Sequence, residues 1–291
     1  MPLVRNFYNE TYYDKVQKKR VDTPPSESYN LFIDKSDYGA AYGGAVSDRL
    51  KYSRYIYSQM YLSYRQGGQV VRPLFFDNPQ DYQAYEHSDS SFMLGEAIMV
   101  SPVLTQGVKG GDSYNSYFPK GKWYDLNSEL DPLIIDTSAG GEYVNTVKAS
   151  WAHTNLHLKA GKIIPFQKNK DGFKQTKLLE TKHKMGFIIY RDEAKKYAEG
   201  HTLVDDGISQ LSYANNDFTL WKLRYADKSI NFWVQYGNQQ YTPKDQLIDT
   251  LEYIDIVDAE DLADTNFACY MGIGLTPVDL IPDYNPGTKT L

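Results

Sequence analysis

The sequence predicts an α/β segment followed by two all-β modules, and three patterns carry this prediction. A helical pattern begins at Ser47 and ends at Gly67-Gly68. Two apolar runs follow, Val70–Phe76 and Ala97–Leu104, and neither alternates with polar residues, which is typical of strands buried on both faces in a parallel sheet or barrel. The remainder of the chain shows short apolar runs separated by turn residues, as expected of β-sandwiches.

The helix is predicted by its ends and by its periodicity. Ser47 can cap the first turn, Asp48 lies within that turn, and Gly67-Gly68 stops the helix. Four apolar residues recur at helical spacing: Leu50, Tyr57, Tyr61 and Tyr64. A helix, a glycine turn and a buried strand form the αβ half of a βαβ unit. The preceding residues, Asn9–Ala45, are polar and irregular and are predicted to form a long loop.

A polar insert separates the two apolar runs. It carries Asp77, Asn78, Pro79, Asp81, Glu86, His87 and Asp89. Polar side chains beyond the C-terminal end of a buried strand are where α/β folds place ligands. The other interpretation is an ordinary surface loop whose oxygens serve turns, and the residues alone favour that one.

The second half of the chain is predicted to form the two all-β modules. The expected strands are Ser116–Phe118, Lys122–Leu126, Ile134–Ile135, Tyr143–Val147 and Asn155–Leu158 in the first module, and Gly186–Tyr190, Phe218–Tyr225, Ile230–Gln235 and Thr250–Ile256 in the second. The polar segment Lys168–Gln175 marks the boundary between them. The predicted domains are therefore 1–95, 96–168 and 169–291.

Composition excludes several classes of protein. The net charge of −6 disfavours a nucleic-acid surface, and no apolar run approaches the ~20 residues of a membrane span. The single cysteine, Cys269, excludes an intrachain disulfide and a cysteine-based zinc site. The chain contains 26 tyrosines, which suit half-buried β surfaces and sugar-stacking clefts, although genomic bias would explain the number equally well.

Two short motifs have a catalytic or metal-binding interpretation and a structural one. His153 and His157 share one face of a predicted strand, but no third ligand is evident, so packing is favoured over a metal site. Asp205-Asp206-Gly207 could be a calcium or acid–base pair, but a turn fits it better. The sequence has no GxSxG nucleophile elbow and no phosphate-binding glycine loop.

Several ordered blocks resemble glycoside hydrolase family 31, in particular its acid α-glucosidase type. The blocks are Val71–Asp77, Phe92–Gly95, Ile98–Leu104, Tyr117–Asp125, His157–Pro165 and Val204–Gly207. They span most of residues 1–210, and the resemblance fades after Tyr225. It implies the C-terminal end of a TIM-type (β/α)8 barrel (end of strand seven, helix, strand eight), followed by proximal and distal β-sandwich domains. It also implies hydrolysis of α-linked glucosides with retention of the anomeric configuration.

The resemblance places the catalytic residues outside this chain. Retention requires two carboxyl groups about 5–5.5 Å apart. In the family both are aspartates on barrel strands that precede the matching segment, and no block here corresponds to either. The family's Arg-Asn-His triplet at the end of strand seven corresponds to Arg5-Asn6-Phe7. Arg5 is thus a candidate substrate-binding residue, and Phe7 replaces a histidine that could donate hydrogen bonds to a sugar. Three explanations stay open: the pocket has decayed, the alignment with the family is off by one residue, or the loop is rebuilt.

The expected function is therefore part of a retaining α-glucosidase acting on α-glucosides or oligosaccharides. The alternative is a catalytically inactive relative that serves as a structural or carbohydrate-binding subunit. Two barrel strands alone would expose edges and an apolar inner face, so the chain is expected to need the missing barrel portion, either upstream in the same protein or on a second chain. No cofactor or metal is expected.

The resemblance also implies a location in the secretory pathway, in lysosomes or outside the cell. The start of the chain shows no signal peptide and reads as the interior of an element, which suggests a piece of a longer protein. Asn9, in the triplet Asn9-Glu10-Thr11, is a candidate glycosylation site.

Overall fold

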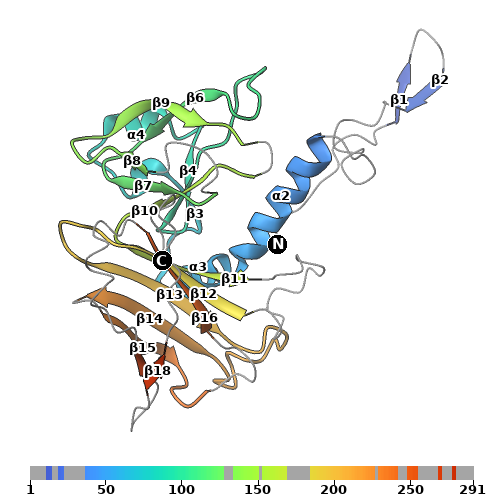
Figure 1. Cartoon of the computed structure of the whole chain (residues 1–291). Coiled ribbons are helices and arrows are strands. Elements are labelled where there is room, and N and C mark those ends of the chain that lie inside the picture. The colour runs from blue at the N-terminus through green and yellow to red at the C-terminus, as the bar shows by residue number, and fades with distance from the viewer. Residues whose placement is uncertain are drawn as a thin grey trace.

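The protein is described by a computed structural model that shows two large β-sheets and a long, bent helix beside them (Figure 1). The structure describes residues 11–14, 19–22, 37–127, 134–150, 153–168, 184–226, 229–241, 248–254, 268–270 and 277–279. Two short antiparallel pairs lie outside the large sheets: β1 (Thr11–Asp14) with β2 (Lys19–Asp22), and β17 (Ala268–Tyr270) with β18 (Pro277–Asp279).

The long helix consists of α2 (Asp37–Lys51) and α3 (Ser53–Gln66), which meet at Tyr52. The prediction that Ser47 caps the helix start is wrong, because the helix already begins at Asp37. Gly43 and Gly44 do not stop it, since a helical glycine costs only about 1 kcal/mol and three alanines of α2 favour the helix. The expected end at Gly67 is confirmed, where the Gly67 N–H donates to the Ser63 carbonyl.

The first sheet has six antiparallel strands in the order β3-β4-β5-β10-β7-β8. Their bounds are β3 (Val71–Pro73), β4 (Phe92–Leu94), β5 (Ile98–Val100), β7 (Lys122–Asp125), β8 (Ile134–Asp136) and β10 (Leu156–Lys159). A separate pair, β6 (Ser113–Phe118) and β9 (Glu142–Lys148), lies in the same module (Figure 1).

The predicted parallel strand over Val70–Phe76 is wrong in length and in pairing. Only Val71–Pro73 is extended; it pairs antiparallel with β4, and residues Leu74–Phe76 form a short 3-10 helix, η1. Pro73 has no N–H to donate to a ladder, so proline is found at the ends or edges of strands. β3 is accordingly the edge strand of the first sheet.

The second sheet has the strand order β15-β14-β13-β11-β12-β16. Its strands are β11 (Lys162–Lys168), β12 (Lys184–Tyr190), β13 (Ala198–Val204), β14 (Thr219–Ala226), β15 (Ser229–Gly237) and β16 (Ile248–Ile254). Two of the pairings, β11 with β13 and β12 with β16, are parallel, and the other three are antiparallel. The chain passes from the first sheet to the second through the tight turn at Ala160-Gly161, where Gly161 has φ +82°.

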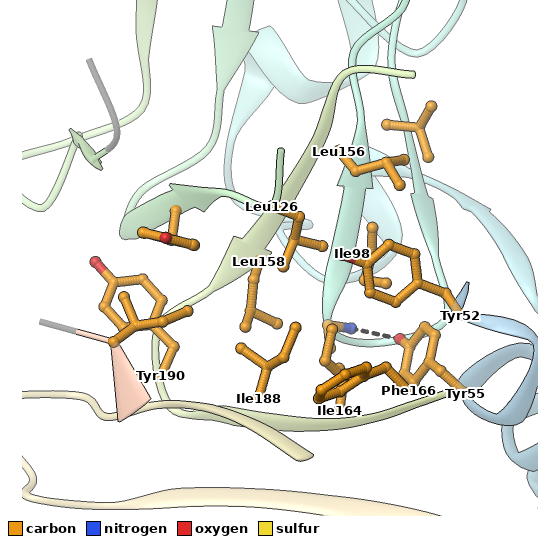
Figure 2. Packing of buried hydrophobic residues seen from close by; sticks show 14 residues of the cluster. Tyr52, Tyr55, Ile98, Leu126, Leu156, Leu158, Ile164, Phe166, Ile188 and Tyr190 are labelled. Atoms are coloured by element: carbon orange, nitrogen blue, oxygen red, sulfur yellow. Dashed lines mark hydrogen bonds between the residues drawn. The ribbon is translucent and has the colours of Figure 1, made fainter. Parts of the chain in front are cut away.

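The main core lies where the two sheets and the helix meet. Leu158 of β10 points toward Ile188 of the second sheet (Figure 2), and Leu156 and Ile164 belong to the same buried cluster. The intervening His157 points to the opposite side of its strand, where it contacts Phe118. This alternation follows from the two-residue period of a strand, and it gives each sheet one face in the shared core.

Tyr55 fastens α3 to the first sheet. Its hydroxyl donates to the Leu94 carbonyl at 2.8 Å and accepts from the Ala97 N–H at 2.9 Å, the bond drawn in Figure 2. The ring is buried in the shared core beside Tyr52. Ser58 performs the same task toward the second sheet, since its hydroxyl accepts from the Leu203 N–H at 2.8 Å. The helix therefore holds the two sheets at a fixed separation.

Glu96 connects the two sheets by charge. Its carboxylate lies 3.1 Å from Lys162 Nζ and 3.5 Å from His201 Nδ1. The His201 imidazole and the Lys162 ammonium hold the pKa of Glu96 at about 2, below its ordinary 4.5, although partial burial opposes them.

The depressed pKa of Glu96 predicts an acid-sensitive contribution to stability. A carboxyl whose folded pKa is lowered stabilises the native state above its unfolded pKa, and this contribution is lost as the pH falls from about 4.5 toward about 2. We expect urea-unfolding midpoints of Glu96→Gln to lie below those of the wild type near neutral pH and to converge with them in acid. Parallel pH profiles of the two proteins would contradict this role.

Candidate functional site

The residues predicted to bind substrate or carry a glycan lie outside the described part of the chain. Arg5, Asn6, Phe7 and Asn9 are all in this category. Their roles stay predictions. The other candidate residues are described, and they fall into three clusters.

The two histidines of the candidate metal motif, His153 and His157, have different surroundings. His153 Nδ1 lies 2.9 Å from Asp48 Oδ1, and the other Asp48 oxygen accepts from the Thr154 N–H at 3.1 Å. His157 is buried, 3.2 Å from the Ser101 hydroxyl, and burial lowers its pKa to about 3. Each imidazole therefore has its own structural partner, as the packing interpretation expects. Within the described residues, no group of three His, Cys, Asp or Glu side chains could hold a metal ion.

Asp205 lies at the contact between α3 and the second sheet. Its Oδ2 accepts from the Tyr57 hydroxyl at 2.6 Å and from the Tyr213 hydroxyl at 3.4 Å, while Oδ1 accepts from the Gly207 N–H at 2.8 Å. Asp206 Oδ1 accepts from two backbone N–H groups of the same turn. The turn interpretation is therefore confirmed: Asp206 shapes the loop after β13, and Asp205 joins that loop to α3.

Arg54 is fully buried near the same carboxylate. Burial lowers its pKa to about 10, while the negative charge of Asp205 opposes this shift. Charged side chains are rarely buried without compensation, so Arg54 and Asp205 support each other. An aromatic stack lies beside this pair, because the ring of Tyr61 stacks on the ring of Tyr213 with centroids 5.2 Å apart. The cluster is a structural clamp between α3 and the loop after β13.

The polar insert between β3 and β4 is an ordered element. Asp77 is 3.0 Å from Arg72, whose guanidinium also donates to the Gly95 carbonyl at 2.8 Å. Asp81 caps the short helix α4 (Tyr82–Glu86), since its Oδ1 accepts from the Ala84 N–H. Its Oδ2 accepts from the Tyr117 hydroxyl at 2.5 Å, and this raises the pKa of Tyr117 along with burial. The surface-loop interpretation holds for these carboxylates, because turns and ion pairs use them.

The insert also presents a group of aromatic rings that the sequence analysis missed. Phe75 and Tyr85 stack in parallel with centroids 4.5 Å apart and planes 6° apart, and Phe76 meets Phe75 edge-on at 5.3 Å. Tyr82 lies three positions before Tyr85 and thus on the same side of α4. The i, i+3 tyrosines after a helix cap were the available signal.

Residues 67–164 match the family model described as the glycosyl hydrolase family 31 C-terminal domain. This segment runs from the glycine turn after α3, through the whole first sheet and the insert, into β11. The match assigns residues 67–164 to the C-terminal domain type of glycosyl hydrolase family 31, and the β-rich fold of this segment agrees with it.

Relatives of known name are α-glucosidases and similar enzymes. The chain is 32% identical to "Probable maltase-glucoamylase 2" of Homo sapiens over 57% of its own length and 6% of that protein. It is 30% identical to "Alpha-glucosidase" of Hordeum vulgare over 62% of its length and 19% of that protein. It is 32% identical to "Lysosomal alpha-glucosidase" of Bos taurus over 57% of its length and 18% of that protein. The chain therefore spans less than a fifth of each relative.

A solved structure supports the same architecture. The crystal structure of the Tris-bound glucosidase II α subunit superimposes with a TM-score of 0.74 at 14% identity, over 89% of this chain and 27% of that one. At this identity the likeness establishes the fold. Within the described residues, no helix has the length and apolar character needed to cross a membrane.

Proposed function

We propose that this chain is the C-terminal part of a retaining α-glycoside hydrolase of the α-glucosidase type, whose catalytic aspartates lie on a barrel portion outside the chain. The family match and the named relatives support the reaction class. The domains would be a barrel remnant over 1–95, a proximal β-sandwich over 96–168 and a distal one over 169–291. Names of relatives such as the lysosomal enzyme support a place in the secretory pathway.

The single structural observation that carries the proposal is an uncovered apolar surface on α3 and β3. Met60 and Tyr64 lie four positions apart on α3, on the side away from the sheets, and are 44% and 78% exposed. Val71, on the edge strand β3, is 56% exposed. A helix and the edge strand that follows it, each with apolar residues toward solvent, are parts that the neighbouring strands and helices of a barrel would cover.

The proposal is tested by activity of a longer protein. We expect the chain, expressed together with the barrel portion that its relatives carry upstream, to hydrolyse an α-linked glucoside and to release the α-anomer first, which proton NMR detects. Substitution of either barrel aspartate by alanine should abolish turnover, since each provides one of the two required carboxyl groups. A folded, inactive protein would contradict the proposal.

Phe7 favours a second candidate function, an inactive relative with a structural or carbohydrate-binding role. A pocket built to use hydrogen bonds to sugar hydroxyls loses discrimination strongly when one donor is removed. Phe7→His in the longer protein separates the two candidates. Gain of turnover in Phe7→His from an inactive parent would indicate a decayed pocket, whereas an active parent would exclude the second function.

A further inference from the structure

We propose that Phe76, Tyr82 and Tyr85 form a stacking platform for the glucose rings of a neutral α-glucan chain. The identity of the sugar rests on the proposed function, but the existence of the platform rests on the geometry of the insert. These three residues are called the aromatic platform below.

The rings of the aromatic platform are accessible. Phe76 is 48% exposed, Tyr82 72% and Tyr85 45%, so each offers a ring surface to a ligand. Single exposed aromatic residues are common, but a contiguous exposed group on an ordered loop is typical of a binding surface. Pyranose rings carry faces of C–H groups, which pack on aromatic rings in the way apolar side chains do.

The platform is also rigid, which reduces the entropy lost on binding. Two contacts fix the Tyr85 side chain: its ring stacks on Phe75, and its hydroxyl donates to the Pro79 carbonyl at 3.2 Å. Phe75 itself packs on the core of the first module beside Leu74 and Ala84. A preformed aromatic surface binds more tightly than one that must be ordered by its ligand.

The charge of the insert selects a neutral ligand. Residues 74–91 contain four carboxylates, Asp77, Asp81, Glu86 and Asp89, and no lysine or arginine. This composition repels nucleic acids, phosphorylated sugars and acidic peptides. Gln80 and Gln83 are exposed next to the rings and can exchange hydrogen bonds with sugar hydroxyls. Aromatic faces with uncharged amides and carboxylate acceptors complement a polyhydroxylated chain.

The position of the platform suits the outer glucose units of a long substrate. Phe76 ends η1, directly after β3, so the platform lies on the loop that connects the antiparallel strands β3 and β4. α4 belongs to the first module and lies apart from α3 (Figure 1), so the platform is distinct from the uncovered surface of α3. A platform at this place would favour long α-glucans over disaccharides.

The test measures binding of maltoheptaose, a neutral α-linked glucose oligomer, to this 291-residue chain by titration NMR or calorimetry. We expect Tyr82→Ala to weaken binding about threefold to tenfold, the effect of removing one stacked ring. Tyr82→Phe should retain most of the affinity, because the ring face remains. Tyr64→Ala is the matched control: it removes an exposed tyrosine from α3 and should leave the affinity unchanged.

The outcomes separate this inference from the proposed function. Absence of maltoheptaose binding, or equal weakening by Tyr64→Ala, would overturn the platform even if the longer enzyme is active. Platform-dependent binding by a protein without hydrolytic activity would leave the inference standing while the proposed function fails. Loss of maltoheptaose binding in high salt would also overturn the inference, since stacking contacts with a neutral sugar are insensitive to screening.

Discussion

Gly200→Ala is expected to destabilise the second sheet more than any other single methyl addition considered for this protein. Gly200 lies in β13 opposite Ile163 of β11, in one of the two parallel pairings. A Cβ at this position would lie 1.9 Å from the Ile163 carbonyl oxygen and 2.8 Å from its carbon. Both are backbone atoms, so the two strands must move apart. We expect a loss of about 3 kcal/mol in the free energy of unfolding, measured by urea denaturation.

The control for this substitution is Gly43→Ala in α2. A Cβ at Gly43 meets nothing within 4 Å, and the residue is helical and exposed. Replacing a helical glycine by alanine should stabilise the protein by about 0.5–1 kcal/mol. If Gly200→Ala left the unfolding midpoint unchanged, the close pairing of β11 with β13 would be wrong.

Tyr55→Phe should have the second largest effect, although it removes only one oxygen atom. That oxygen donates to the Leu94 carbonyl and accepts from the Ala97 N–H, and Tyr55 is 1% exposed. Phenylalanine keeps the ring packing but leaves both backbone groups without this partner in the interior, at about 1–3 kcal/mol for each group. We expect a loss of about 3 kcal/mol and faster amide exchange at Ala97, measured by hydrogen exchange.

Tyr64→Phe provides the comparison for Tyr55→Phe. Tyr64 belongs to the same helix and is 78% exposed, so its hydroxyl is hydrated in the folded and unfolded states alike. We expect no change in stability beyond about 0.5 kcal/mol. A similar cost at both positions would mean that the hydroxyl of Tyr55 does not hold α3 to the first sheet.

Local patterns in the sequence predicted the β-rich fold well. The runs Lys122–Leu126 and Gly186–Tyr190 lie within one residue of strand β7 and inside strand β12. Turn residues and apolar runs act within a few positions, so they can be recognised without knowledge of the rest of the chain. The sequence does not predict β13, because its residues, AEGHTLV, include a glycine and three polar side chains and show no apolar run. Its strand conformation depends on its neighbours β11 and β14.

The candidate sites also contain features that the local sequence predicts and features that depend on distant contacts. The turn at Asp205-Asp206-Gly207 was predictable, because aspartate and glycine favour turns through contacts within the loop itself. The contact of Asp205 with Tyr57 joins residues 148 positions apart, so nothing near either residue in the sequence indicates it. The aromatic platform likewise depends on the stack of Phe75 with Tyr85 across the insert.

The sequence by itself determined the class of secondary structure, the end of the helix at Gly67 and the resemblance to family 31 glycoside hydrolases, since each depends on residues close together in the chain or on ordered motifs. Only the tertiary structure decided that Val71–Pro73 forms an antiparallel edge strand and that Tyr55 and Ser58 join one helix to both sheets. Strand direction and partner choice are fixed by long-range hydrogen bonds and shared burial. Those interactions exist only after distant segments have come together.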